Sequence, residues 1–159
     1  DNVGLTYYRL GEFDNALVYW QQALAAYEKL EDRPKKLRID QNIGLLEIAR
    51  GHFDVARKGL DAALRAAEDH QLPEEQAVTS TYLAELALAE GRHADALGYA
   101  QHAGEIFARR ADKRGMIEAQ LLAARTQLEL GNAAAAKEAL APIALGELGA
   151  EQHAIALLA

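Results

Sequence analysis

Cysteine is absent from this chain of 159 residues. That absence excludes disulfide bonds, thiolate zinc sites and cysteine nucleophiles, and it fits a reducing compartment. We therefore expect a cytoplasmic protein. No uninterrupted apolar run approaches the roughly 18 residues that a membrane-spanning helix needs, so we expect no association with a membrane.

Basic residues are outnumbered: 17 Lys and Arg stand against 24 Asp and Glu, which gives a formal net charge of −7. Proteins that bind nucleic acids without regard to sequence neutralise phosphates with Lys and Arg, so we expect no nucleic-acid partner for this segment. Hydrophobic residues make up 50% of the chain, which is enough for the continuous core of one ordinary domain. Many Ala and few Lys residues favour a GC-rich bacterial source.

A short pattern returns four times along the chain. The stretch RLGEFDNAL, which starts at Arg9, recurs as ARGHFDVAR, AEGRHADAL and ELGNAAAAK. One constant period therefore separates the members of two sets of identical residues, Gly11, Gly51, Gly91 and Gly131, and Ala16, Ala56, Ala96 and Ala136. Repetition at a fixed period is typical of units that are too small to bury their own apolar face and that stack on their neighbours.

Each period contains two segments with helical periodicity, which in the second unit are Pro34–Arg50 and Phe53–His70. The Gly between them suits the left-handed conformation that ends a helix, so the second helix turns back on the first. Asp32, Asp112 and the stretch LPEE at Leu72 to Glu75 are typical of helix starts. The sequence therefore predicts helical hairpins.

Small residues recur where the two helices of a hairpin face each other. The second helices carry apolar residues at i, i+3, i+4 and i+7 spacing, which predicts one buried stripe; in the first unit the stripe is Phe13, Ala16, Trp20, Ala23, Leu24 and Tyr27. The repeated Ala lets the helices approach closely. The facing position of the first helix is also small, being Gly4, Gly44, Ala84 and Ala124.

These residues resemble the tetratricopeptide repeat, because its signature residues recur at the relative places of Gly4, Tyr7, Gly11, Phe13, Ala16, Trp20, Ala23 and Leu24. The likeness is strong in the first two units and weaker in the next two. A period of 40 in place of the usual 34 is similar to kinesin light chains, spindle-orientation adaptors and bacterial regulators. The resemblance implies an all-α fold, a right-handed superhelical α-solenoid of stacked helical hairpins, and partners that are peptides or proteins.

The repeats divide the chain into units at residues 1–31, 32–71, 72–111 and 112–148, followed by the start of a fifth at 149–159. We expect one solenoid fragment over 1–159. Neither end shows a polar capping helix, so we expect the chain to be an excised piece of a longer solenoid. Its open ends would permit end-to-end self-association.

The resemblance places a ligand groove on the first helices of the repeats. The residues it assigns there are Asn2, Leu5, Tyr8, Arg9, Arg38, Gln41, Asn42, Leu45, Ile48, Thr81, Tyr82, Glu85, Leu121 and Arg125. A carboxamide both donates and accepts, so the pair Asn2 and Asn42 suits the backbone of an extended peptide. The alternatives are a hydrogen bond from each Asn to a neighbouring helix, and packing between repeats for Tyr8 and Tyr82.

The five His residues show neither i, i+4 pairing nor an accompanying acidic ligand set. We therefore expect no metal site and no cofactor. A nucleophile, a base and an orienting group do not converge in any readable order, so we expect no catalytic residue and no enzyme. The sequence favours a protein or peptide interaction scaffold of unidentified partner. A ligand-sensing region of a larger bacterial regulator and a self-associating structural module are the two alternatives.

Overall fold

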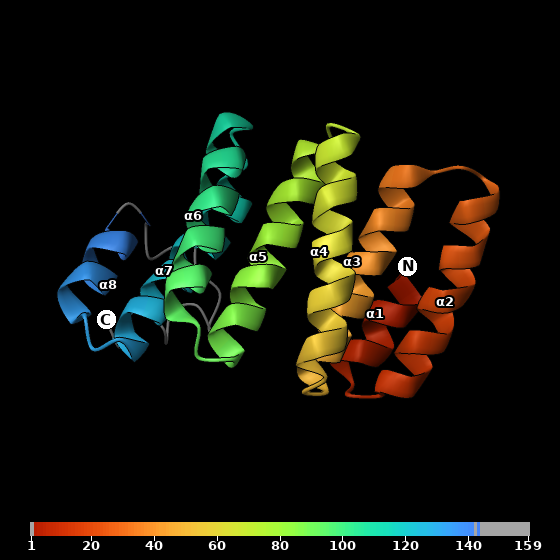
Figure 1. Ribbon diagram of the computed structural model, residues 1–159, viewed down its shortest axis with the longest axis horizontal. Helices are drawn as coiled ribbons and strands as arrows, with labels where there is room; N and C mark the ends of the chain where they lie inside the picture. Colours follow the sequence, from red (N-terminus) through yellow and green to blue (C-terminus); the bar gives the residue numbers. More distant parts are fainter. Residues whose placement is uncertain (1, 142, 144–159) are drawn as a thin grey trace. The chain divides into compact units, whose positions relative to one another are not determined.

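The helices follow one another at the spacing that the repeats predict (Figure 1). The computed structural model describes residues 2–141 and 143, and regular structure in that part is entirely helical. Its eight helices are α1 (Asn2–Arg9), α2 (Phe13–Lys29), α3 (Arg33–Ala49), α4 (Phe53–Asp69), α5 (Pro73–Ala89), α6 (His93–Arg109), α7 (Lys113–Glu129) and α8 (Ala133–Leu140). The predicted all-α class and the helical hairpins are confirmed. The expected fifth repeat at 149–159 lies outside the described residues, and the repeat boundaries and the right-handed path of the solenoid stay predictions.

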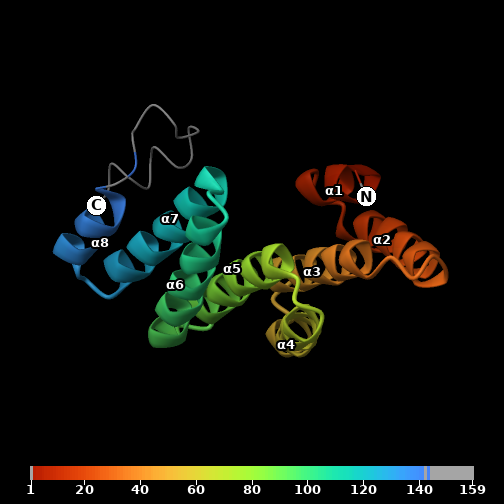
Figure 2. The ribbon, with the colours of Figure 1, turned by 90° about the horizontal axis from the view of Figure 1, so that it is seen from above.

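The described residues form two compact units that divide inside α5, between Tyr82 and Leu83. In the first unit α2 packs against both α1 and α3, and α3 packs in turn against α4 (Figure 2). In the second unit α7 packs against both α6 and α8. None of the helices in the described residues is long and apolar enough to cross a membrane.

A left-handed residue ends each helix that is followed by another. Gly11, Gly51, Gly91 and Gly131 have φ of 75°, 75°, 72° and 76°. Two hydrogen bonds close each turn; at Gly51 its N–H donates to the Ile48 carbonyl at 2.9 Å and the next N–H donates to the Glu47 carbonyl at 2.9 Å. This pair of bonds is the Schellman motif, which satisfies carbonyls at the helix end.

The turns between hairpins have the same conformation without glycine. Glu31, Gln71 and Ala111 have φ of 52°, 54° and 54°, and the same two hydrogen bonds close each of these turns. Three further left-handed turns therefore recur with the same period as the glycine turns.

The predicted helix starts are also found. The Asp32 carboxylate accepts from the Lys35 N–H at 3.2 Å, and the Asp112 carboxylate accepts from the Gly115 N–H at 3.0 Å. Each bond satisfies a backbone donor that lacks a partner within its helix. Pro73 is the first residue of α5, where its missing N–H costs no hydrogen bond.

The small residues of the first helices accommodate large side chains of the second. A Cβ atom at Gly4 would overlap the indole ring of Trp20, and one at Gly44 would lie 2.6 Å from a methyl group of Leu60. The repeated Ala residues of the second helices are fully buried, as their role in close packing requires: Ala16, Ala56, Ala96 and Ala136. The glycines thus face Trp20 and Leu60 and make room for them.

The same two positions hold a different pair in the third repeat. Ala84 and Ala100, which lie one repeat period after Gly44 and Leu60, belong to one buried cluster of the second unit. In the second repeat glycine is therefore combined with a large residue, in the third alanine is combined with a small one, and in the fourth the pair is Ala124 and Leu140. Within each hairpin the two side chains must fit each other, because the interface between the helices is close-packed.

We expect Gly44→Ala and Leu60→Ala to be strongly non-additive. Gly44→Ala should lower the free energy of unfolding by about 1 to 3 kcal/mol, because the new methyl group overlaps Leu60. Leu60→Ala should lower it by about 2 to 5 kcal/mol through the cavity that it leaves. The double variant, which reproduces the pair of the third repeat, should lose at least about 1 kcal/mol less than the sum. Urea denaturation measures all three values, and strict additivity would refute the account of this interface.

Candidate functional site

A cavity of ≈ 300 Å³ lies within the first unit, between side chains of α1, α3 and α5. The residues that line it are Asn2, Leu5, Arg38, Gln41, Asn42, Glu74, Glu75, Val78 and Tyr82. Six of the fourteen residues predicted for the groove are therefore brought together here: Asn2, Leu5, Arg38, Gln41, Asn42 and Tyr82.

Helical geometry explains why α3 contributes three neighbouring residues to the cavity. Arg38, Gln41 and Asn42 stand at i, i+3 and i+4, so they share one face of the helix. Leu37 and Gly44 lie on another face of α3 and are buried, where Leu37 packs with Ala63 and Ala67 of α4. Packing of α3 on α4 thus turns Arg38 and Asn42 toward the cavity, and Gln41, at i+4 from Leu37, lies between the two faces.

Asn42 presents to the cavity a side-chain amide that is unpaired within the described part of the chain. Its side chain is half-buried, and among the described residues it makes no hydrogen bond. Asn2, the equivalent residue of the preceding repeat, is exposed and lines the same cavity. Leu5 and Val78 add apolar surface beside the two carboxamides.

Gln41 makes the hydrogen bond to a neighbouring helix that sequence reasoning considered for the Asn residues. Its side chain is buried, and its amide nitrogen lies 3.0 Å from the Glu75 carbonyl oxygen and 2.9 Å from the Thr79 hydroxyl oxygen. The Thr79 hydroxyl donates in turn to the Glu75 carbonyl at 2.6 Å. Gln41 therefore joins α3 to α5 through its amide nitrogen, and its predicted contact with a ligand stays a prediction.

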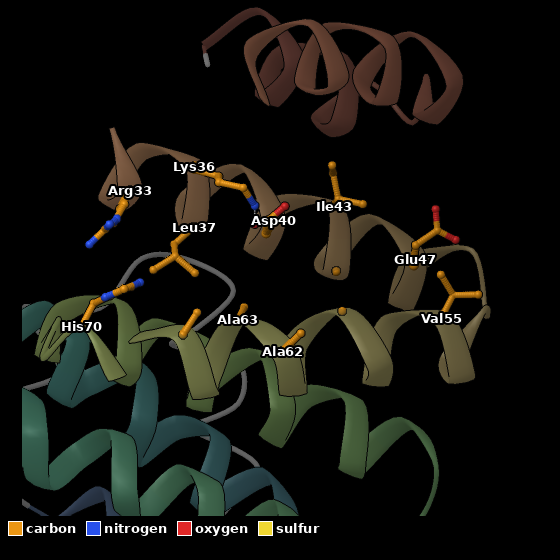
Figure 3. Close-up of a pocket in the computed structure, with 13 residues that line it drawn as sticks. Arg33, Lys36, Leu37, Asp40, Ile43, Glu47, Val55, Ala62, Ala63 and His70 are labelled. Carbon is orange, nitrogen blue, oxygen red and sulfur yellow. Dashed lines mark hydrogen bonds and ion pairs between the residues drawn. The ribbon is translucent and has the colours of Figure 1, made fainter. Parts of the chain in front are cut away.

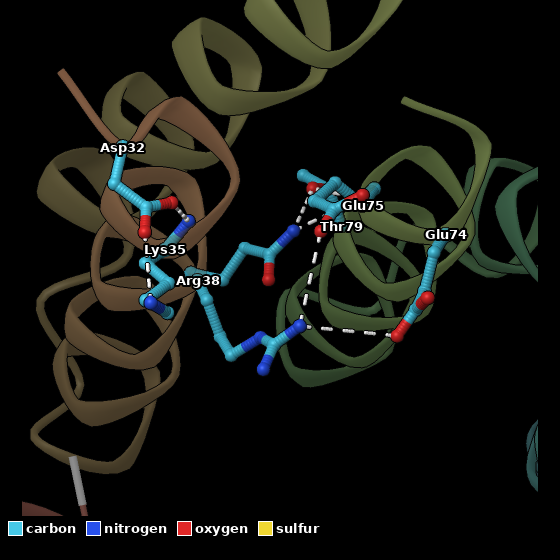
Figure 4. A network of polar contacts seen from close by, with 7 residues as sticks. Asp32, Lys35, Arg38, Glu74, Glu75 and Thr79 are labelled. Carbon is cyan, nitrogen blue, oxygen red and sulfur yellow. Dashed lines mark hydrogen bonds and ion pairs between the residues drawn. The ribbon is translucent and has the colours of Figure 1, made fainter. Parts of the chain in front are cut away.

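Arg38 brings a positive charge to the acidic edge of the cavity (Figure 4). Its guanidinium lies 3.9 Å from a carboxylate oxygen of Glu74 and 3.9 Å from one of Glu75. Both distances are longer than a direct charge-assisted hydrogen bond. The Arg38 side chain is 53% exposed, so these pairs contribute little to stability, and the guanidinium retains donors for another group.

Other predicted residues lie elsewhere. Tyr8 packs against Phe13 and Trp20 within the first hairpin, with ring centroids 5.7 and 6.0 Å apart, and its predicted place in the groove stays a prediction. Thr81 is buried and its hydroxyl donates to the Ala77 carbonyl. The remaining residues do not line the cavity: Arg9, Leu45, Ile48, Glu85, Leu121 and Arg125. Of these, Leu121 is buried and Arg9 is exposed.

Glu74 and Glu75 line the cavity, although sequence reasoning assigned them only to a helix start. Val78 lies one repeat period after Arg38, which was predicted for the groove. Since residues 74, 75 and 78 share one helical face, the period could have found Glu74 and Glu75 as well. No group of three or more His, Asp or Glu side chains that could hold a metal ion occurs in the part of the chain that the structure describes.

Glu85 of the second unit has the most perturbed acid–base equilibrium at the predicted positions. Burial raises the pKa of this half-buried carboxyl to about 7; Arg125 opposes the shift, and Glu118 adds to it. A carboxyl with this pKa changes charge close to neutral pH. The second unit therefore carries a proton-dependent charge on α5.

We expect the Glu85 carboxyl to make stability fall as pH rises. Its folded pKa, about 7, lies above the ordinary value of 4.5, so its contribution is complete below pH 4.5 and is lost as pH rises through 7. The loss should be on the order of 2 kcal/mol. Denaturation between pH 4.5 and 8 should show this decline in the natural chain and in Glu105→Gln, a change at an exposed residue of α6, but not in Glu85→Gln. An equal pH profile for the natural chain and Glu85→Gln would refute the assignment.

Comparison with known sequences finds a family match over less than half of the chain. No curated protein matches it, but the sequence profile of the tetratricopeptide repeat family matches residues 1–69. That region holds α1 to α4, the left-handed turns at Gly11 and Gly51, and the packing of Gly4 on Trp20 and of Gly44 on Leu60. Repeats of this family are generally non-catalytic and typically serve as protein–protein interaction scaffolds. Over residues 1–69 the chain is thus similar to the tetratricopeptide repeat family.

Proposed function

We propose that the cavity between α1, α3 and α5 binds an extended peptide segment of a partner protein. The observation that carries the proposal is Asn42, a half-buried carboxamide that lines the cavity and makes no hydrogen bond among the described residues. A partly buried amide without a partner gains more from a ligand's hydrogen bonds than an amide that is already paired.

The chemistry of the carboxamide fits the main chain of the partner. An extended peptide presents N–H donors and C=O acceptors along its length, and an Asn side chain offers one acceptor oxygen and a donor NH₂ group to match them. Asn2 supplies the same groups from α1. Recognition through the main chain makes affinity depend weakly on the sequence of the partner.

The other groups in the cavity would set preferences for side chains. Leu5 and Val78 offer an apolar contact. Arg38 retains hydrogen-bond donors, while Glu74 and Glu75 place two carboxylates next to it. The protein would thus be a cytoplasmic interaction scaffold, and the bound segment of its partner would carry both apolar and polar side chains.

A peptide selected from a random displayed library against the whole chain provides the probe for this proposal. With this peptide, Asn42→Ala should weaken binding by about 1 to 3 kcal/mol, the range for a partner group left unpaired. The melting temperature should change little, because the side chain makes no hydrogen bond to the described part of the fold. Titration calorimetry measures the affinity.

Two controls sharpen the test. Asn15→Ala makes the same chemical change on α2, where the side chain is exposed and bonds Glu12, and it should leave the affinity unchanged. Replacing one peptide N–H of the probe at a time by an ester oxygen should find a position whose loss is not additive with Asn42→Ala. Unchanged affinity together with a large fall in melting temperature would assign Asn42 to packing and remove the basis of the proposal.

A further inference from the structure

A second and larger groove, of ≈ 650 Å³, lies on α3 and α4 within the first unit (Figure 3). Its floor consists of small or apolar residues: Ile43, Gly44, Gly59, Ala62, Ala63 and Ala66. On α3 the lining includes Lys36, Asp40, Ile43 and Glu47, which recur at helical spacing. That face of α3 lies opposite the face of Arg38 and Asn42, so the groove is separate from the peptide cavity.

Gly59 is the least expected residue of the groove floor. It lies in the interior of α4, where Gly is less favourable than Ala. A Cβ atom at this position would meet nothing within 4 Å, so packing within the first unit does not require the glycine. Because Gly59 has no side chain, the floor of the groove is open there, and the backbone of a bound molecule can approach α4 closely.

Charge is distributed unevenly along the groove. Lys36 and Asp40 lie 2.9 Å apart and largely neutralise each other. Arg33 and His70 lie at the same end of the groove (Figure 3). Among the described residues, neither side chain has an ion pair or a hydrogen bond.

The dimensions of the groove match a short helix. The stretch of α3 from Arg33 to Glu47 extends about 20 Å, since an α-helix rises 1.5 Å per residue. A helix of about four turns covers that distance and presents apolar side chains at i, i+3, i+4 and i+7 along one line. A floor built from Gly and Ala lets the axes of two helices approach closely.

We propose that this groove docks an amphipathic α-helix of a partner protein, with the apolar face of that helix on the Gly59 floor and an acidic residue beside Arg33 and His70. The carboxylate complements the end of the groove that lacks internal pairing, and the apolar face covers the small floor residues. This surface would serve a partner other than the extended peptide, because it lies on a different face of α3.

Two synthetic helical peptides of about four turns are the probes. They share a row of Leu residues and differ only at one end, which carries two Glu in the first and two Lys in the second. Fluorescence anisotropy should show the acidic peptide binding the natural chain about fivefold more tightly than the basic one. Arg33→Glu should reverse that preference.

Filling the floor tests the contact surface. Gly59→Leu should weaken binding of the acidic peptide at least about tenfold by occupying the groove, and Gly59→Ala, which adds one methyl group, should weaken it about threefold. Gly98→Leu is the matched control, because Gly98 is an exposed helical glycine of α6 that also has nothing within 4 Å of its Cβ position. This control and Asn42→Ala should leave the affinity unchanged. Circular dichroism of the Ala variant verifies that α4 remains folded.

Four results would overturn the proposal. The first is absence of saturable binding of the acidic peptide up to about 1 mM. The second is unchanged affinity in both Gly59 variants, or an unchanged charge preference in Arg33→Glu. The third is self-association of the peptide-free chain that Gly59→Leu abolishes in sedimentation, which would assign the groove to a second copy. The fourth is tighter competing binding of hexadecanoate, which would assign it to an acyl carboxylate.

Discussion

The left-handed turn that closes each helix is the constraint on which the rest of the structure depends. It reverses the chain with two backbone hydrogen bonds at Gly11, Gly51, Gly91 and Gly131 within hairpins, and it does so at Glu31, Gln71 and Ala111 between them. Because both sets of turns recur with the same period, residues that lie one period apart take the same place in successive hairpins. Gly4 and Gly44 therefore face the large residue of their own hairpin, and Asn2 and Asn42 line one cavity.

Sequence predicts those features that only one residue type satisfies. Glycine marks four turns because it adopts positive φ at little cost, and Asp32 and Asp112 mark helix starts because a short carboxylate reaches the N–H groups there. Glu31, Gln71 and Ala111 share no chemistry, so their turns could not be read from residue type. The pattern predicted that a small residue is needed at Gly4 and Gly44. It did not predict their contacts with Trp20 and Leu60, since a periodic pattern does not say which side chain fills a space.

The candidate site was predictable only in part. The constant repeat period placed Asn2, Asn42 and Tyr82 on one surface, because it transfers backbone position from repeat to repeat. It does not transfer hydrogen bonds: Gln41 turns to the Glu75 carbonyl and to Thr79 only because α5 lies within reach. The groove at Gly59 was not predicted, since an open floor depends on which neighbouring side chains leave space unfilled.

Equilibrium denaturation of Gly51→Ala and Ala111→Gly tests the central constraint most directly. A Cβ at Gly51 would meet nothing within 4 Å, so Gly51→Ala reports on backbone conformation alone, and we expect it to lower the free energy of unfolding by about 1 to 2 kcal/mol. Ala111→Gly should raise it by about 0.5 to 1 kcal/mol, because relief of the left-handed strain exceeds the entropy cost of glycine. If both substitutions destabilised the protein, or if neither changed its stability, the left-handed turn would not be the constraint that sets this fold.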